Sequence, residues 1–309
     1  MAHGALESCL RAAWRKGRAL APLALATFLA ACEPEPPGGV FPDLDSQVGG
    51  GSDGKADGAG GGGDGGAGSS TLSGTWAQIT EWSTCVKVAD EIETRAWRLL
   101  RVELKQEGGK LHEKRTLCEL RLTPIFGLMT VVPQPLIDAH PLMTVESVLV
   151  GQGEGAPYLG GPEIQQFGIA FKDIYGDPMP AKADVDDPRL VDSENDGKPG
   201  ATFHVGPSCS IHIAQRESAT LHGSVQADGS FRGGGVHLTE QTVFSSTKAI
   251  CGSQFSTRAN DGANSFVMVR AEAFDADKNG EVSCAELRAV GESIAKPMAA
   301  DDKRCLAKP

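Results

Sequence analysis

The sequence predicts a mainly β protein, an antiparallel β-barrel or β-sandwich with a short helix near its C-terminus. Two observations support this class: apolar and polar residues alternate in many short segments, and glycine-rich turns separate these segments, while helical periodicity is scarce. We expect the β-rich domain at 71–270 and a separate C-terminal unit at 271–309. The alternation is clearest at residues 97–99, 102–104, 202–205 and 210–213.

The charge balance of the chain narrows its possible partners. The 309 residues include 29 Lys and Arg against 40 Asp and Glu, which gives a net charge of −11 and a pI near 5.1. Because phosphate affinity comes from clustered Lys and Arg, we expect no nucleic-acid partner. No apolar run after the N-terminal segment reaches about 18 residues, so an integral helical membrane protein is excluded.

Residues 1–31 have the pattern of a secretory leader, because basic residues precede an apolar run at 19–31. That run ends in Leu29-Ala30-Ala31-Cys32, which resembles the lipobox of bacterial lipoproteins. In that family two small residues fit the signal peptidase, and the cysteine thiol accepts a diacylglycerol. The resemblance implies cleavage before Cys32, lipidation of Cys32 and a membrane as the partner of the lipid. The alternative is an ordinary cleaved signal with an incidental cysteine.

Residues 32–70 are expected to be a disordered tether behind the lipidated cysteine. Of the 38 residues at 33–70, 14 are glycine, and such a segment cannot bury enough apolar surface to offset its chain entropy. Its root-mean-square reach would be roughly 35 Å. Glu33 stands where some inner-membrane lipoproteins carry Asp. We therefore expect the bacterial cell envelope, and within it the outer membrane, on its periplasmic or surface face.

The start and the end of the β-rich domain carry a second resemblance. Gly74-Thr75-Trp76 is similar to the Gly-x-Trp that opens the first strand of lipocalin-type barrels. In that family an arginine on the last strand packs over the tryptophan, and Arg270 has the corresponding place here. The resemblance implies a barrel that carries a small hydrophobic ligand. An unspecified β-barrel or β-sandwich is the alternative.

Cysteine usage indicates an oxidising compartment. Apart from Cys9 in the leader and Cys32, the chain has an even number of cysteines, as disulfide-bonded exported proteins do. Six cysteines allow 15 pairings, and we favour sequential pairing because it keeps each bridge within one local unit. The expected bridges are then Cys85–Cys118, Cys209–Cys251 and Cys284–Cys305.

The strongest chemical signal is the segment 275–286, which fits D-x-[DN]-x-[DN]-G-x₅-E without a mismatch and so resembles the EF-hand calcium loop. Alternate side chains offer oxygens as the backbone wraps the ion, and a glycine permits the sharp turn. The segment before the loop, 266–269, reads as a strand, so we expect a strand-loop-helix. The predicted Ca²⁺ ligands are Asp275, Asp277, Asn279, Glu281 through its carbonyl, Ser283 through water, and Glu286 as a bidentate ligand.

A second acidic segment begins in the same way. Asp192, Glu194 and Asp196 occupy alternate positions before a glycine, but Pro199 follows, and position twelve is Phe203. This segment is a possible second calcium site, and a solvated acidic loop is the equal alternative. Extracellular calcium is plentiful, so that a weak site would fill and hold a structural ion.

A long hairpin is expected from residues 211–226 and 231–245, closed by a two-residue turn at Asp228-Gly229. This register places His222 and His237 on one solvent-facing side. No nucleophile elbow, zinc-protease motif or phosphate-binding loop occurs, and we therefore expect no catalytic residues and no enzyme. The sequence favours a calcium-binding cell-envelope lipoprotein in which calcium is structural. The alternative is the lipocalin-like carrier.

Overall fold

The computed structural model describes residues 72–87, 90–124, 128–252 and 255–306. All of them belong to the compact unit 58–309. The predicted leader, the lipidation site Cys32 and the tether lie outside the described residues.

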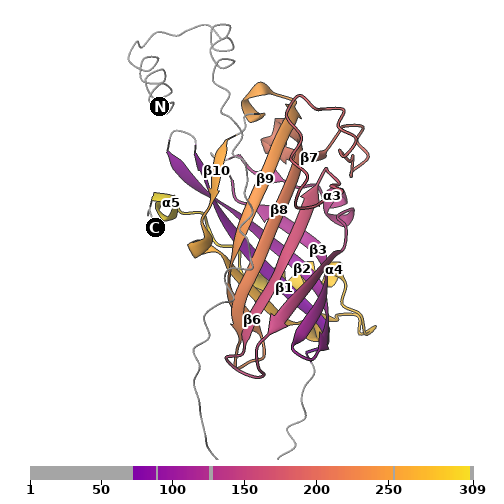
Figure 1. Cartoon of the computed structure of the whole chain (residues 1–309), viewed down its shortest axis with the longest axis vertical. Coiled ribbons are helices and arrows are strands. Elements are labelled where there is room, and N and C mark those ends of the chain that lie inside the picture. Colours follow the sequence, from indigo (N-terminus) through magenta and orange to yellow (C-terminus); the bar gives the residue numbers. More distant parts are fainter. Residues whose placement is uncertain (1–71, 88–89, 125–127, 253–254, 307–309) are drawn as a thin grey trace, which may run out of the picture. The chain divides into compact units, whose positions relative to one another are not determined.

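The described chain is mainly β, as the alternation predicts, and its strands form one antiparallel sheet (Figure 1). The strands are β1 Gly74–Lys87, β2 Glu91–Glu107, β3 Lys110–Leu122, β4 Thr130–Val131, β5 Met143–Leu149, β6 Pro157–Phe167, β7 Ala201–Val205, β8 Ser210–Val225, β9 Phe231–Ser246, β10 Ser256–Ala259 and β11 Ser265–Arg270. The helices are α3 Gln134–Asp138, α4 Cys284–Ile294 and α5 Lys303–Leu306. The predicted short helix near the C-terminus is therefore present.

Eight of the strands pair in a circuit that follows the chain. The order is β1, β2, β3, β5, β6, β8, β9 and β11, and β11 pairs again with β1. The narrowest links are β5 with β6 and β9 with β11, each with three residue pairs in register. The other three strands lie outside the circuit: β4 pairs with β7, β7 pairs with β8, and β10 pairs with β1.

The two faces of the circuit pack against different core clusters. The inner face holds the largest core cluster, in which the Trp76 and Phe231 rings meet edge to face at 5.2 Å. The outer face of β1 and β2 packs against α4, whose Leu287 is fully buried there. Gly291 permits this close approach, because a Cβ atom at that position would lie 3.1 Å from the Trp97 ring. Strand β1 is therefore buried on both faces.

Arg270 packs over Trp76 as the sequence predicts. The guanidinium carbon lies 4.4 Å from the ring centroid, and Nη1 donates a 2.8 Å hydrogen bond to the carbonyl of Ser73. The register places Trp76 opposite Arg270, so the first and last strands of the circuit meet at this pair.

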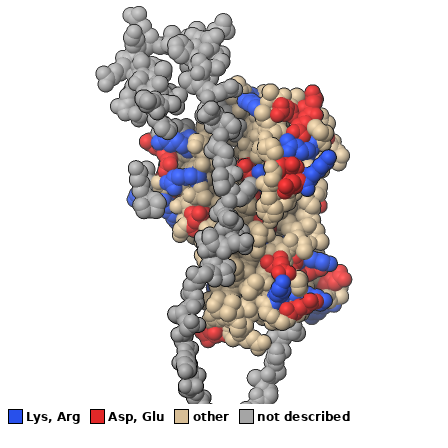
Figure 2. Space-filling view, in the orientation of Figure 1, with Lys and Arg blue, Asp and Glu red and all other residues tan. Residues whose placement is uncertain are grey.

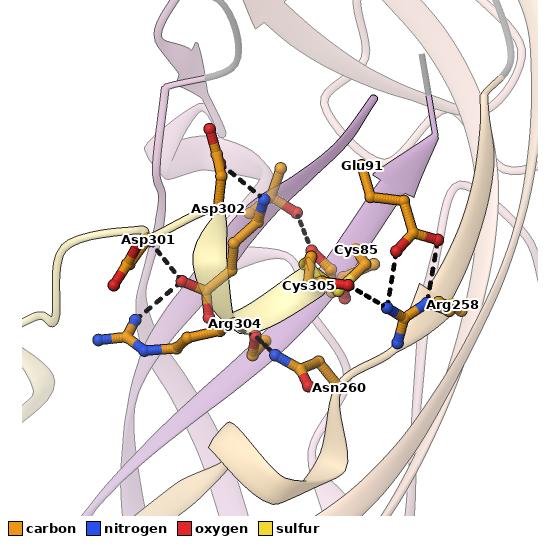
Figure 3. The surroundings of a disulfide bond; sticks show 12 residues. Cys85, Glu91, Arg258, Asn260, Asp301, Asp302, Arg304 and Cys305 are labelled. Atoms are coloured by element: carbon orange, nitrogen blue, oxygen red, sulfur yellow. Dashed lines mark hydrogen bonds and ion pairs between the residues drawn. A yellow bond between two sulfur atoms is a disulfide. The ribbon is translucent and has the colours of Figure 1, made fainter. Parts of the chain in front are cut away.

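Two of the three predicted disulfide pairings are wrong. Cys209–Cys251 is present, but Cys85 pairs with Cys305 and Cys118 pairs with Cys284. The physical reason is topological: β2 lies between β1 and β3, and the C-terminal segment returns across their outer face. Figure 3 shows the Cys85–Cys305 bridge, beside which Arg258 donates to the carbonyl of Cys305 at 2.7 Å.

The hairpin β8–β9 is present with a register one residue away from the prediction. Val225 pairs with Phe231, so five residues rather than two form the connection. Because a shift of one residue exchanges the two faces of a strand, His222 and His237 lie on opposite faces. His237 is buried and stacks on Trp82 with ring centroids 5.2 Å apart, which corrects the prediction of a solvent-facing side chain.

Among the residues that the structure describes, none of the helices has the length and apolar character needed to cross a membrane. On the face drawn in Figure 2, basic and acidic side chains gather in the same clusters rather than in a separate basic patch.

Candidate calcium site

The candidate site lies in the loop between β11 and α4, in a strand-loop-helix. A 3₁₀ turn at Glu272–Phe274 follows β11, and Phe274 packs against the outer core cluster. The loop ends where Ser283 caps α4: its hydroxyl accepts the N–H of Glu286, and the Glu286 side chain accepts the N–H of Ser283. This reciprocal capping box fixes the start of the helix.

Three of the predicted ligands converge. One carboxylate oxygen from each of Asp275, Asp277 and Glu286 lies within 4.8 Å of the other two. Within the described part of the chain, this is the one group of His, Cys, Asp or Glu that meets such a spacing. Carboxylate oxygens are the ligands that Ca²⁺ prefers, and the like charges repel one another until a cation neutralises them.

Asp275 shapes the loop through its backbone. Its carboxylate accepts the N–H groups of Asn279 at 3.2 Å and of Gly280 at 2.8 Å. Lys278 and Gly280 have φ values of +59° and +86°. Glycine adopts this region at little cost, so Gly280 supplies the sharp turn that the motif predicts.

Glu286 holds both ends of the loop together. One oxygen accepts the N–H of Ala276 at 2.8 Å, and the other accepts the N–H and the hydroxyl of Ser283, both at 2.8 Å. These bonds, first the backbone N–H of Ser283, lower the pKa of Glu286 from 4.5 to about 2. The carboxylate is therefore ionised at neutral pH and already placed beside Asp275 and Asp277.

Two further predicted ligands, Asn279 and Ser283, form side-chain hydrogen bonds to other residues of the same loop. The Asn279 side-chain oxygen accepts the N–H of Glu281 at 2.7 Å, and its nitrogen donates to Asp277 at 3.0 Å. The Ser283 hydroxyl donates to Glu286. The structure thus brings three carboxylates together, while the Asn279 and Ser283 side chains make hydrogen bonds within the loop.

Residues far away in the sequence anchor the loop to the sheet. Val282 is buried in the outer core cluster, and its carbonyl accepts a 2.6 Å hydrogen bond from Nε of Arg101 on β2. The Cys118–Cys284 disulfide joins the first residue of α4 to β3, and Arg288 donates to the Cys118 carbonyl at 3.1 Å. Sequence reasoning missed these supports because no local pattern marks Arg101 or Cys118 as a partner of the loop.

The second acidic segment repeats the backbone pattern of the first. Asp192 accepts the N–H groups of Asp196 at 3.0 Å and Gly197 at 2.8 Å, and Asn195 has a φ of +58°. The other two carboxylates of the segment bond to Thr202 on β7. The backbone N–H of Thr202 donates to Glu194, and its hydroxyl donates to Asp196 at 2.7 Å.

Within the part of the chain that the structure describes, the carboxylates of this segment do not come as close together as those at 275–286. Burial raises the pKa of Glu194 and outweighs the hydrogen bond from the Thr202 N–H, which lowers it. The segment also has Phe203 at position twelve, where the first loop has the carboxylate of Glu286.

Comparison with protein-family models, with curated proteins and with solved structures finds no match to the chain.

Proposed function

We propose that the protein is a cell-envelope lipoprotein whose β-rich domain binds Ca²⁺ through the loop 275–286, mainly for stability. The observation that carries the proposal is the convergence of Asp275, Asp277 and Glu286 in a loop that follows β11 and whose last part is fixed to β2 and β3 through Val282 and Cys284. The carboxylates and the Asn279 oxygen would hold the ion, the Glu281 carbonyl would complete the turn, and Ser283 would act through water. Bound calcium would neutralise the repulsion between these three carboxylates.

A structural ion fits the surroundings of the loop better than a sensor ion. Sensor EF-hands respond by changing the angle between two helices. Here one helix follows the loop, and its Leu287, Gly291 and disulfide-bonded Cys284 fix it against β2 and β3. A site of about 10⁻⁴–10⁻³ M affinity would fill outside the cell.

Calorimetric titration of calcium into the exported chain tests the site. Asp277→Asn is a suitable variant, because Asp277 is exposed and its side chain bonds only to the loop residue Asn279 in the described contacts. We expect it to weaken binding roughly tenfold, since ligand charge sets affinity. Asp192→Asn is the matched control in the second loop. Equal titrations for the wild type and Asp277→Asn would contradict the assignment.

The proposed anchor accounts for the sequence before the described residues. Cleavage before Cys32, lipidation of its thiol and a flexible tether would hold the domain at the outer membrane. Mass spectrometry of the N-terminal peptide tests this, because two or three acyl chains would add a mass that Cys32→Ser removes. An unmodified Cys32 in protein from a bacterial envelope would contradict the anchor.

We also infer that the sheet closes as an up-and-down barrel similar to the lipocalin type. The support is the circuit of eight sequential strands and the contact of Arg270 with Trp76. A carrier of a small hydrophobic ligand ranks second as a function. The reason is that aromatic rings fill the inner face, which leaves little space for a ligand. The same face also holds the buried ion pair of Arg98 with Glu217, which is an unfavourable neighbour for an apolar molecule.

A further inference from the structure

The calcium loop contains a dipeptide with a chemistry of its own, which the proposed function does not use. Asn279 is followed directly by Gly280, and the sequence has no other Asn-Gly step. Both residues are exposed in the loop between β11 and α4. Asparagine is a labile residue, because the nitrogen of the next peptide unit can attack its side-chain amide.

Glycine at position 280 leaves the attacking nitrogen open. Apart from its chain neighbours, no heavy atom lies within 4 Å of the place where a Cβ atom of residue 280 would stand. The φ angle of Gly280 is +86°, a conformation that other residues rarely adopt. The ring that would join this nitrogen to Cγ of Asn279 therefore meets no side chain at residue 280.

The Asn279 side chain is held at both of its polar atoms. Its oxygen Oδ1 accepts the N–H of Glu281 at 2.7 Å, and its nitrogen Nδ2 donates to Asp277 at 3.0 Å. Negative charge develops on Oδ1 when a nucleophile attacks Cγ, and an N–H group at that oxygen stabilises it as the donors of an oxyanion hole do. The bond from Glu281 therefore activates the amide of Asn279.

Asp275 acts on the other reacting group. Its carboxylate accepts the N–H of Gly280 at 2.8 Å, and this hydrogen must leave when the nitrogen forms a new bond. A carboxylate at hydrogen-bond distance from the proton of a nucleophile has the position of a general base. The loop thus places a base at the Gly280 nitrogen and a hydrogen-bond donor at the Asn279 oxygen.

We propose that Asn279 is a self-modification site, which the loop converts to aspartate and isoaspartate when calcium is absent. The Gly280 nitrogen bonds to Cγ of Asn279, and its proton passes to the carboxylate of Asp275. The bond from Cγ to Nδ2 then breaks, and Nδ2 takes up that proton and leaves as ammonia. Water adds to the cyclic imide and opens it at either of its two carbonyl carbons. The reaction consumes one water and exchanges no electrons.

The two products have different effects on the loop. Opening of the imide at Cγ gives aspartate, which keeps the spacing of the ligands. Opening at the main-chain carbonyl carbon gives isoaspartate, whose backbone is longer by one methylene group. That methylene shifts Glu281 and Glu286 relative to Asp275, and the ligands of an EF-hand loop depend on fixed positions. Isoaspartate at position 279 should therefore abolish calcium binding.

Calcium protects Asn279, and this part of the inference rests on the proposed function. In the proposed complex the ion binds the Asp275 carboxylate and the Asn279 oxygen, which removes both the base and the activated amide. At one hundred times the dissociation constant about 1% of the loops are free, so that the modification should be about a hundredfold slower. Loss of calcium would then leave a permanent chemical record in the loop.

Peptide mass spectrometry of the exported chain tests the proposal after incubation at neutral pH in excess calcium or in excess chelator. Chromatography separates the aspartyl peptide from the isoaspartyl peptide. In chelator we expect Asn279 to react faster than Asn195, an exposed asparagine that precedes Asp196 in the second acidic segment. In calcium at one hundred times the dissociation constant we expect the hundredfold decrease at Asn279.

Asp275→Asn tests the role of the carboxylate at the Gly280 nitrogen. It should slow the reaction of Asn279 in chelator by at least roughly tenfold, because the base is lost. Asp192→Asn is the matched control, since Asp192 accepts the N–H of Gly197 at 2.8 Å in the second acidic segment. It should leave the rate at Asn279 unchanged. An equal or faster reaction in Asp275→Asn would contradict the role of the base.

Three results would overturn the proposal or part of it. An unmodified Asn279 in chelator would overturn it entirely. Equal rates in calcium and in chelator, for a protein that binds calcium by calorimetry, would overturn the protection and leave the calcium site standing. If calorimetry shows no calcium binding, the proposed function and the protection both fail, and the rate in chelator alone decides whether Asn279 modifies itself.

Discussion

At the scale of single residues, the hydrogen bonds of Glu286 decide how the calcium loop is prepared. The same carboxylate caps α4 through Ser283 and accepts the backbone N–H of Ala276. The sequence marks Glu286 as a ligand through its spacing alone. Its role as a capping residue could be predicted only because Ser283 precedes it by three residues, which is the spacing of a capping box.

The pKa of Glu286 gives a prediction about pH. Because its pKa is lowered from 4.5 to about 2, its contribution to stability is fully present above 4.5 and is lost as the pH falls toward 2. NMR titration of the side-chain carboxyl carbon in calcium-free protein should show a midpoint near 2. Ser283→Ala removes the hydroxyl that bonds to Glu286, and the midpoint should rise. A wild-type midpoint at 4.5 would contradict the described bonds.

Leu287 gives a second prediction at this scale. It is fully buried between α4 and the outer face of the sheet. Leu287→Ala should lower the free energy of unfolding by about 2–5 kcal/mol, the cost of a large-to-small change in a core. Val236→Ala is the control, because Val236 is exposed and should cost little. Chemical denaturation measures both, and equal losses would show that α4 does not depend on Leu287.

At the scale of elements, the C-terminal unit shows what local patterns reveal and what they do not. The loop 275–286 and the helix after it follow from spacing and periodicity. The pairing of Cys118 with Cys284 does not, because it depends on β3 lying under the start of α4. The register of β8 with β9 is likewise set by a five-residue connection rather than by the expected tight turn.

The Cys118–Cys284 bridge carries a prediction at this scale. Replacing both cysteines with alanine should weaken calcium binding, because the start of α4 and Ser283 lose a covalent link to the sheet. It should also cost about 2–5 kcal/mol of stability. The double alanine variant of Cys209 and Cys251 is the control, and it should leave the calcium affinity unchanged. Calorimetric titration of both variants measures the difference, and equal affinities would contradict the anchoring role.

At the scale of the whole molecule, alternation predicts a mainly β protein because each strand shows two faces. It does not predict which strands complete the circuit, since β9 with β11 depends on three residue pairs between distant segments. The buried charges on the inner face escaped prediction for the same reason. Arg98, Arg115 and Glu217 lie inside only because the strands complete the circuit.

The central claim is that the folded chain binds calcium in the loop 275–286. Thermal unfolding of the exported chain in excess calcium and in excess chelator tests it most directly. At one hundred times the dissociation constant, binding stabilises the native state by about 2.7 kcal/mol, which raises the midpoint by roughly 5–10 °C. We predict this rise in the wild type and its reduction to about half in Asp277→Asn, because a tenfold weaker site at the same calcium concentration keeps about 1.4 kcal/mol of the stabilisation. Identical midpoints with calcium and with chelator would contradict the account.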